Sequence, residues 1–279
     1  MIIVGTGEKY VGKKTVTFKI TGAALKANMV TGVPASVEYT GAKQTPDVEV
    51  KGLTKGKDYK VTYVNNTAAG KATVVVTGIN GYTGTVKKTF QIHPFDLSKN
   101  TEDRFQILSK DITAVYEKNG SRPSVEVAFN GISMTENVDY TLTYKNNNKA
   151  GDTQKAPQLI IKGKGNFKGT AAPVAFAITK QDLGKLQASA ADLLVKNGKK
   201  YHKTVPVIVD LNGKPLKNGV DFMVTGYTYA DGSEITSVPE AGAVIKVTAE
   251  GKGNYEKTIT AQFRILANDK NIAAAKVTV

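Results

Sequence analysis

The sequence repeats itself, and this internal repeat limits the possible folds more than any other feature of the chain. Residues 58–66 (DYKVTYVNN) closely match residues 139–147 (DYTLTYKNN). Each match is followed by an Ala-Gly pair, an apolar segment, a glycine-rich turn with an aromatic residue, and a closing Phe-x-Ile. A third, more divergent copy places its aromatic residue at Tyr255, where the other two have Tyr82 and Phe167. Such a recurring block predicts a series of similar structural units.

The segments within each copy have the composition and alternation of β-strands. Val, Thr, Ile, Tyr and Phe dominate them, while Gly, Asn, Asp and Lys fill the short gaps between them. We therefore predict an all-β fold of tandem immunoglobulin-like Greek-key β-sandwich repeats. Residues 186–195 are rich in Ala and Leu and could contain a helical turn, but their place in the repeat predicts an opening strand.

The repeat also predicts how the chain is divided. Residues 1–20 match only the last two strands of a unit, and residues 271–279 resemble the opening of another, so we expect a piece of a longer array. Short linkers are expected near residues 93–95 and 179–181. The predicted segments are a C-terminal hairpin of a truncated repeat (1–20), repeat 1 (21–92), repeat 2 (93–179), repeat 3 (180–266) and the start of a further repeat (267–279).

The repeated pattern carries a family resemblance over nearly the whole chain. Asp-Tyr-x-x-x-Tyr-x-Asn-Asn, then Ala-Gly, Gly-x-Gly-Asn-Tyr-x-Gly and Phe-x-Ile, resembles the Ig-like repeats of large cell-surface proteins from Gram-positive bacteria. The resemblance implies extracellular tandem modules that serve as stalks or adhesive arms. The third copy departs from the pattern, because residues 226–232 (GYTYADG) replace the Asn-Asn turn, and we expect a distinct loop there.

The recurring residues have a structural explanation that needs no chemistry. Glycines permit positive φ in turns, and paired asparagines are good turn formers. Asp58, Asp139 and Asp221 recur singly before an aromatic residue, which indicates a turn or strand-end cap. The recurring aromatic residues are large enough to fill the gap between two sheets.

The charge of the chain favours anionic partners. Lys plus Arg outnumber Asp plus Glu by 38 to 24, for a net charge of +14. Cell-wall polyanions, glycans and host surface proteins are all candidates. No run of five or more basic residues indicates a nucleic-acid arm, so no specific nucleic-acid partner is expected. The sequence also contains no stretch long and apolar enough to predict a membrane span.

Enzyme chemistry finds little support in the sequence. The chain has no cysteine, and its two histidines, His93 and His202, occupy unmatched positions in different repeats. Glycosidases need two acids held close together in a cleft, which small sandwiches rarely offer. Glycine-rich segments such as 163–166 and 251–254 connect predicted strands and lack the helix start of a phosphate loop. We predict no catalytic, cofactor-binding or metal-binding residue and a non-enzymatic protein.

Two weaker candidates lie in the third repeat. Residues 231–234 (DGSE) could place several oxygen atoms around calcium, but they lack the EF-hand spacing and favour a plain hairpin turn. Tyr227 and Tyr229 lie in the non-repeated insert and alternate along a predicted strand, so they share a face. They are the predicted ligand-binding residues, since they could stack on a sugar, although they could also pack beneath the loop.

The leading functional hypothesis is a structural spacer or adhesive array of a bacterial cell-surface protein. A glycan-binding or host-protein-binding module is the alternative. The hairpin at residues 1–20 should be homologous to residues 74–92, and a lone hairpin is marginally stable. We expect it to cover its apolar face on the first repeat, on another chain, or with a strand from residues 276–279 of a neighbour.

Overall fold

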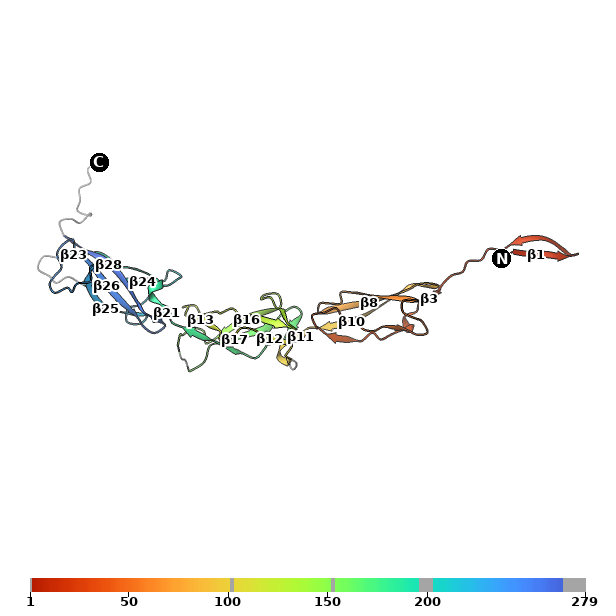
Figure 1. The fold of residues 1–279 in the computed structure, drawn as a ribbon, viewed down its shortest axis with the longest axis horizontal. Coiled ribbons are helices and arrows are strands. Elements are labelled where there is room, and N and C mark those ends of the chain that lie inside the picture. The colour runs from red at the N-terminus through yellow and green to blue at the C-terminus, as the bar shows by residue number, and fades with distance from the viewer. Residues whose placement is uncertain (1, 101–102, 152–153, 196–202, 268–279) are drawn as a thin grey trace, which may run out of the picture. The chain divides into compact units, whose positions relative to one another are not determined.

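The chain folds almost entirely as β-strands. The computed structural model describes residues 2–100, 103–151, 154–195 and 203–267, and Figure 1 shows these segments as short strands joined by turns. The described helical elements are three one-turn 3₁₀ helices, Ala27–Met29 (η1), Leu97–Lys99 (η2) and Leu183–Lys185 (η3). The predicted all-β sandwich class is confirmed.

The chain divides into two compact units, each described by itself. Unit 1 comprises Met1–Ile107, Val127–Thr141 and Ile161–Ala171, and unit 2 comprises Leu108–Glu126, Leu142–Ile160 and Ala172–Val279. The division passes through the second repeat. The junction between the first and second repeats therefore lies within unit 1, and the junction between the second and third lies within unit 2.

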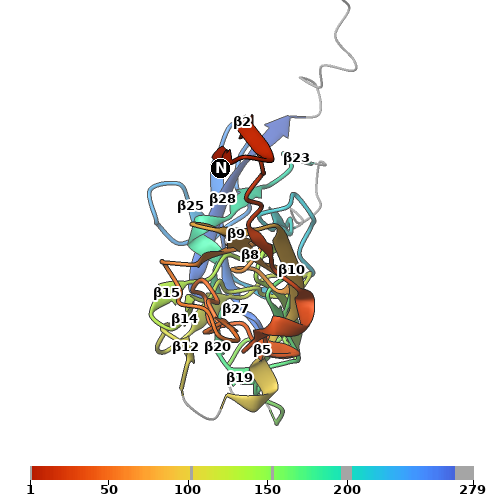
Figure 2. The ribbon, with the colours of Figure 1, turned by 90° about the vertical axis from the view of Figure 1, so that its right-hand side faces the viewer.

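The first repeat contains a four-stranded sheet with the order β5-β10-β8-β7, and β8 and β10 lie side by side in Figure 2. Val74, Phe90 and Ile92 of this sheet are buried against Val30 and Val48. Two short pairs, β3 with β9 and β4 with β6, complete the repeat. Its strands are β3 (Ala23–Ala24), β4 (Val30–Thr31), β5 (Ser36–Glu38), β6 (Glu49–Val50), β7 (Tyr59–Val64), β8 (Gly70–Gly78), β9 (Tyr82–Thr83) and β10 (Thr85–His93).

The second repeat is built from shorter strands in four groups. Their orders are β11-β18, β12-β14-β15, β13-β20 and β16-β17-β19. The strands are β11 (Phe95–Asp96), β12 (Phe105–Ile107), β13 (Thr113–Val115), β14 (Val127–Phe129), β15 (Ile132–Ser133), β16 (Tyr140–Lys145), β17 (Gln158–Gly163), β18 (Phe167–Lys168), β19 (Val174–Ala175) and β20 (Ala177–Thr179).

The third repeat returns to the four-stranded sheet, in the order β23-β28-β26-β25. Residues 187–189 and 193–195 are extended, so the opening-strand interpretation of residues 186–195 is confirmed, and the 3₁₀ turn η3 comes just before them. The strands are β21 (Gln181–Asp182), β22 (Gln187–Ser189), β23 (Leu193–Val195), β24 (Val207–Val209), β25 (Phe222–Tyr229), β26 (Val244–Gly251), β27 (Tyr255–Glu256) and β28 (Thr258–Ala267).

The same strand pairing recurs three times along the chain. The first strand of each repeat pairs in parallel with the strand that carries the recurring aromatic residue: Ala23 with Tyr82, Phe95 with Phe167, and Gln181 with Tyr255. Between successive repeats, β10 ends at His93 and β11 begins at Phe95, while β20 ends at Thr179 and β21 begins at Gln181. A single residue therefore connects the strands of adjacent repeats.

The recurring aspartates and asparagines hold turns, as the sequence predicts. The carboxylates of Asp58, Asp139 and Asp221 accept the backbone N–H four residues earlier, at 2.8, 2.9 and 2.9 Å. Asn65 and Asn146 adopt φ of 55°, a left-handed conformation that asparagine tolerates better than most residues. These residues recur because the backbone needs them.

The N-terminal residues form an antiparallel hairpin of β1 (Ile2–Gly7) and β2 (Tyr10–Thr15), but its register is not the homologous one. In the first repeat Val76 pairs with Val86, which corresponds to Val4 with Lys14. The hairpin instead pairs Val4 with Lys13. Tyr10 extends β2, whereas its counterpart Tyr82 pairs with the opening strand of a complete repeat, which the hairpin does not contain. A one-residue shift turns side chains to the opposite face.

Candidate functional site

The predicted ligand residues Tyr227 and Tyr229 both lie in β25 and are half-buried. Both pack against the core cluster that contains Ile245, Val247 and Phe263. The Tyr227 hydroxyl donates a 2.7 Å hydrogen bond to the Thr204 carbonyl, and the ammonium group of Lys203 lies 5.3 Å from its ring centroid. Their contacts are those of side chains that close the edge of a core, and a ligand role stays a prediction.

The candidate calcium loop is a hydrogen-bonded turn. Asp231 accepts the Ser233 amide at 2.9 Å and the Ser233 hydroxyl at 2.6 Å. These bonds lower the pKa of Asp231, the hydroxyl bond most strongly. In the described part of the chain no group of three or more His, Cys, Asp or Glu side chains is placed to hold a metal ion. His93 is exposed at the end of β10, and His202 lies outside the described residues.

The structure instead concentrates conserved geometry at the two junctions between repeats. The first junction is an aromatic cluster in unit 1. The Phe129 ring lies 5.8 Å from Tyr39, 4.7 Å from Phe95 and 5.0 Å from Phe167, between ring centroids. The Tyr39 ring, from the first repeat, also meets Phe167 edge-on at 5.3 Å. Phe167 was expected to fill the space between two sheets, and here it packs against the preceding repeat.

Arg104 closes one side of the first junction. Its guanidinium lies over the rings of Phe95 and Phe129, 4.7 and 5.0 Å from their centroids. The same group donates to the Glu38 carboxylate at 2.9 Å and to the Tyr39 carbonyl at 3.1 Å. The Arg104 side chain is only 18% exposed, so these contacts are better shielded than those of a surface ion pair.

An asparagine of the second repeat binds two groups of the first. The side-chain oxygen of Asn166 accepts the Ala69 backbone N–H at 2.8 Å. The Asn166 side chain also hydrogen-bonds the Tyr39 hydroxyl. We call this set of one asparagine, one alanine N–H and one tyrosine hydroxyl the junction clamp.

The second junction, in unit 2, repeats the junction clamp with equivalent residues. Asn254 of the third repeat accepts the Ala150 N–H of the second at 2.9 Å and hydrogen-bonds the Tyr116 hydroxyl. The Tyr116 and Tyr255 rings meet edge-on at 5.5 Å. Two independent copies of the same three-residue arrangement indicate a designed contact, since a chance contact would not recur with the same atoms.

The two junctions differ at one hydrogen-bonding position. At the first, the Asn130 side chain donates to the Thr40 carbonyl across the junction at 2.8 Å. The equivalent residue at the second is Asp210, which directly follows β24 as Asn130 follows β14. One Asp210 carboxylate oxygen accepts from the Asn212 and Lys214 amides, and the other is buried without a hydrogen-bond partner.

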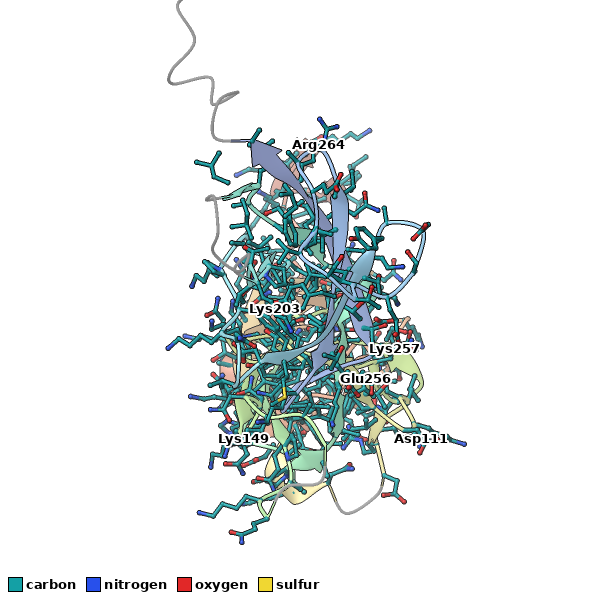
Figure 3. The ribbon with its side chains drawn as sticks, turned by 90° about the vertical axis from the view of Figure 1, so that its left-hand side faces the viewer. Asp111, Lys149, Lys203, Glu256, Lys257 and Arg264 are labelled. Atoms are coloured by element: carbon teal, nitrogen blue, oxygen red, sulfur yellow. The ribbon has the colours of Figure 1, made fainter. Side chains whose placement is uncertain are left out.

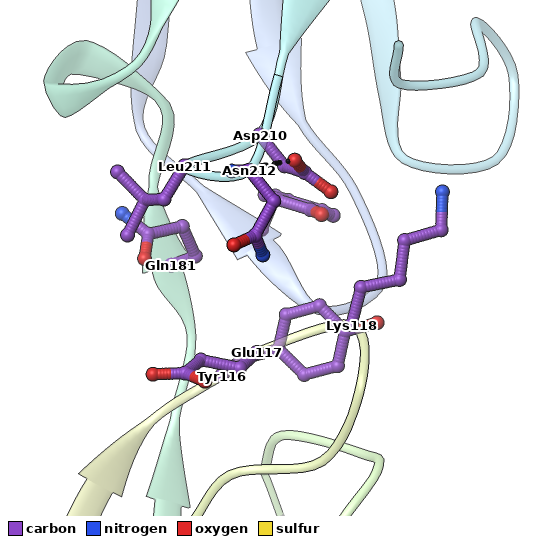
Figure 4. A pocket seen from close by; sticks show the side chains of 8 residues that line it. Tyr116, Glu117, Lys118, Gln181, Asp210, Leu211 and Asn212 are labelled. Atoms are coloured by element: carbon purple, nitrogen blue, oxygen red, sulfur yellow. Dashed lines mark hydrogen bonds between the residues drawn. The ribbon is translucent and has the colours of Figure 1, made fainter. Parts of the chain in front are cut away.

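A small cavity lies beside Asp210 (Figure 4). Its volume of about 20 Å³ has room for a single water molecule. Figure 4 shows Asp210 and Asn212 on one side of it and Tyr116 and Glu117 on the other. The second junction is therefore less completely filled than the aromatic first junction.

The electrostatics of the two clamps match. Burial raises the pKa of the Tyr39 hydroxyl, Asp139 raises it further, and the hydrogen bond with Asn166 opposes both. Burial and Asp221 raise the pKa of Tyr116 in the same way, and the bond with Asn254 opposes them. The pKa of Tyr255 is also raised, first by burial and then by the neighbouring Tyr116. The clamp tyrosines therefore stay protonated, able to hydrogen-bond, through neutral pH.

The clamp was missed from the sequence, although its signal was present. Asn166 and Asn254 sit in the Gly-Lys-Gly-Asn-aromatic segments that were considered only as phosphate loops or turns. The first repeat has Gly81 at this position, which lacks a side chain to accept a bond from a preceding unit. An asparagine present in two copies and absent from the first copy marks a contact between units better than a turn requirement shared by all.

Comparisons with known proteins identify no family for the chain. No protein-family model matches it, and no curated protein matches its sequence. Among solved structures, mouse clustered PcdhgC3 EC1-3 matches with 10% identity and a TM-score of 0.21, over 82% of this chain and 88% of that one. The protocadherin GammaB4 extracellular domain matches with 11% identity and a TM-score of 0.21, over 86% of this chain and 50% of that one. These TM-scores are too low to establish a shared fold, so the fold assignment comes from the strand pairing itself.

No helix among the described residues is long and apolar enough to cross a membrane.

Proposed function

We propose that the chain is a non-enzymatic structural array, a spacer or adhesive arm of a bacterial cell-surface protein, divided into the repeats 21–92, 93–179 and 180–266. The junction clamp carries this proposal. Domains joined by a short linker move relative to each other unless the contact between them is substantial. Here the linker is one residue, and the same clamp holds both junctions. An array that transmits position or force needs such fixed joints.

The extracellular location and the Gram-positive source belong to the proposal and rest on the resemblance of the repeated pattern. The alternative, a module that binds a glycan or a host protein, has no support from an enclosed aromatic site. Tyr227 and Tyr229 pack toward a core, and their free edges are the part that remains available to a ligand.

The test is whether the repeats tumble as one body. Residual dipolar couplings of the full chain should fit one alignment tensor across each junction. The double variant Asn166→Ala/Asn254→Ala should require a separate tensor for each repeat. Gln106→Ala changes an exposed strand residue away from the clamp and is the matched control. Separate tensors in the unsubstituted chain would overturn the proposal.

A further inference from the structure

The outer face of the first repeat's four-stranded sheet has an unusual charge distribution. Residues alternate along β7, β8 and β10, so one set faces the core and the other faces solvent. Lys60, Lys71 and Lys87 all occupy exposed, outward positions on these strands. We call the outward residues of the three strands the lysine face.

The lysine face carries no negative charge. None of its three strands contains an acidic residue. The acidic residues of this repeat are used elsewhere: Asp47 pairs with Lys55 at 3.3 Å, Glu38 pairs with Arg104 at 2.9 Å, and the Asp58 carboxylate caps a turn. Glu49 lies in β6, outside this sheet. No acid therefore neutralises the three ammonium groups.

The strand register spreads the three lysines along the sheet. On β8, Lys60 is opposite Thr77, Lys87 is opposite Val75, and Lys71 lies four residues before Val75. At about 3.3 Å per residue, the set extends for roughly 20 Å along the strands. Such an extended row of like charges fits a linear polyanion better than a compact ligand.

The remaining outward residues indicate which polyanion. Threonines such as Thr62, Thr73 and Thr89 lie between the lysines and offer hydroxyls that both donate and accept hydrogen bonds. The outward positions carry no aromatic ring for base stacking and no arginine for bidentate base contacts. We propose that the lysine face binds linear anionic polysaccharides, with ammonium groups on the acidic substituents and threonine hydroxyls on the sugar hydroxyls.

The third repeat supplies an internal comparison. The equivalent sheet has outward Lys246 and Arg264, but Glu250 lies on the same side of β26. Figure 3 shows the labelled Arg264 side chain on β28. The opposite charges weaken the attraction for an anion, so binding is expected on the first repeat and not on the third.

The experiment compares two variants of equal net charge in the full chain. Lys60→Gln/Lys71→Gln/Lys87→Gln removes the lysine face, and Lys26→Gln/Lys43→Gln/Lys57→Gln removes three exposed lysines elsewhere in the same repeat. Binding is measured to a heparin oligosaccharide of defined length, with neutral dextran and single-stranded oligo(dT) as further probes. Unfolding curves check that both variants are folded.

The face variant should bind heparin about tenfold more weakly than the native chain, and the matched variant should change binding by only about twofold. Equal losses would mean that net charge alone drives binding and would overturn the proposal, as would an absence of heparin binding. Oligo(dT) binding as tight as heparin binding at the same salt would overturn the glycan assignment. The substitutions leave both junction clamps intact, so this result is independent of the proposed function.

Discussion

The first and second junctions share a clamp but fill the surrounding space differently. At the first, Phe95 and Phe129 surround the clamp and Arg104 covers them. At the second, the equivalents of the two phenylalanines are Gln181 and Val209, and a cavity lies beside Asp210. The hydrogen bonds of the clamp determine where successive repeats meet. The apolar filling determines how much free energy the meeting contributes, because buried aromatic area dominates such contacts.

The largest expected effect comes from removing the centre of the first junction. Phe129→Ala should lower the free energy of unfolding by about 3–5 kcal/mol, because this 3% exposed ring contacts three others. Val209→Ala, the matched change at the second junction, should cost about 1 kcal/mol. Hydrogen exchange resolved by residue measures both, since a chain of several domains need not unfold in two states. Equal costs would break the distinction between the two fillings.

Removal of the clamp itself should have similar effects at the two junctions. Asn166→Ala leaves the Ala69 N–H without its acceptor, and Asn254→Ala does the same to Ala150, at a cost of about 1–3 kcal/mol each. The exchange rates of the Ala69 and Ala150 amides report each clamp directly. Each substitution should accelerate exchange only at its own junction. Loss of protection at the other junction would show that the clamps are coupled.

A smaller effect tests the unpaired carboxylate oxygen. Asp210→Asn supplies the amide donor that Asn130 supplies at the first junction and removes a buried oxygen without a partner. It should stabilise the second junction by about 0.5–1.5 kcal/mol, seen as slower exchange at Ala150. The reverse change, Asn130→Asp, should destabilise the first junction. If Asp210→Asn destabilises the chain, the unpaired oxygen has a partner that this comparison does not identify.

The smallest effect near neutral pH is that of tyrosine ionisation, which grows only in alkaline solution. The pKa values of Tyr39, Tyr116 and Tyr255 are raised in the folded chain, so the folded state favours the protonated hydroxyls. Their contribution to stability is complete below the ordinary tyrosine pKa of about 10 and is lost as the pH rises through the folded values.

The second junction should weaken more steeply with alkaline pH, because it contains two tyrosines where the first pairs Tyr39 with Phe167. Exchange at Ala69 and Ala150 between pH 9 and pH 12, corrected for intrinsic rates, compares the junctions. Tyr255→Phe should make the second respond as the first does. Identical pH responses in the unsubstituted chain would contradict this explanation.

Residue patterns alone were enough for the strand-rich fold, the recurring pairing and the turn roles of Asp58, Asp139 and Asp221. Each depends on contacts within one repeat, and alternation and turn residues record such contacts locally. The hairpin at β1 and β2 shows the limit of this reasoning. Its residues match those of a complete repeat, but the register differs by one because the strands that would hold Tyr10 in its homologous place are not part of the hairpin.

The junctions required the tertiary structure. Ala69 and Asn166 are 97 residues apart, and Ala150 and Asn254 are 104 residues apart, so no local pattern connects them. Asn166 looks like any other turn residue in its own segment, since asparagine favours turns in every context. Only the approach of two folded repeats gives its side chain a second repeat to bind. The sequence by itself therefore determined the units, through short-range alternation and turn chemistry, whereas tertiary packing decided how one unit recognises the next.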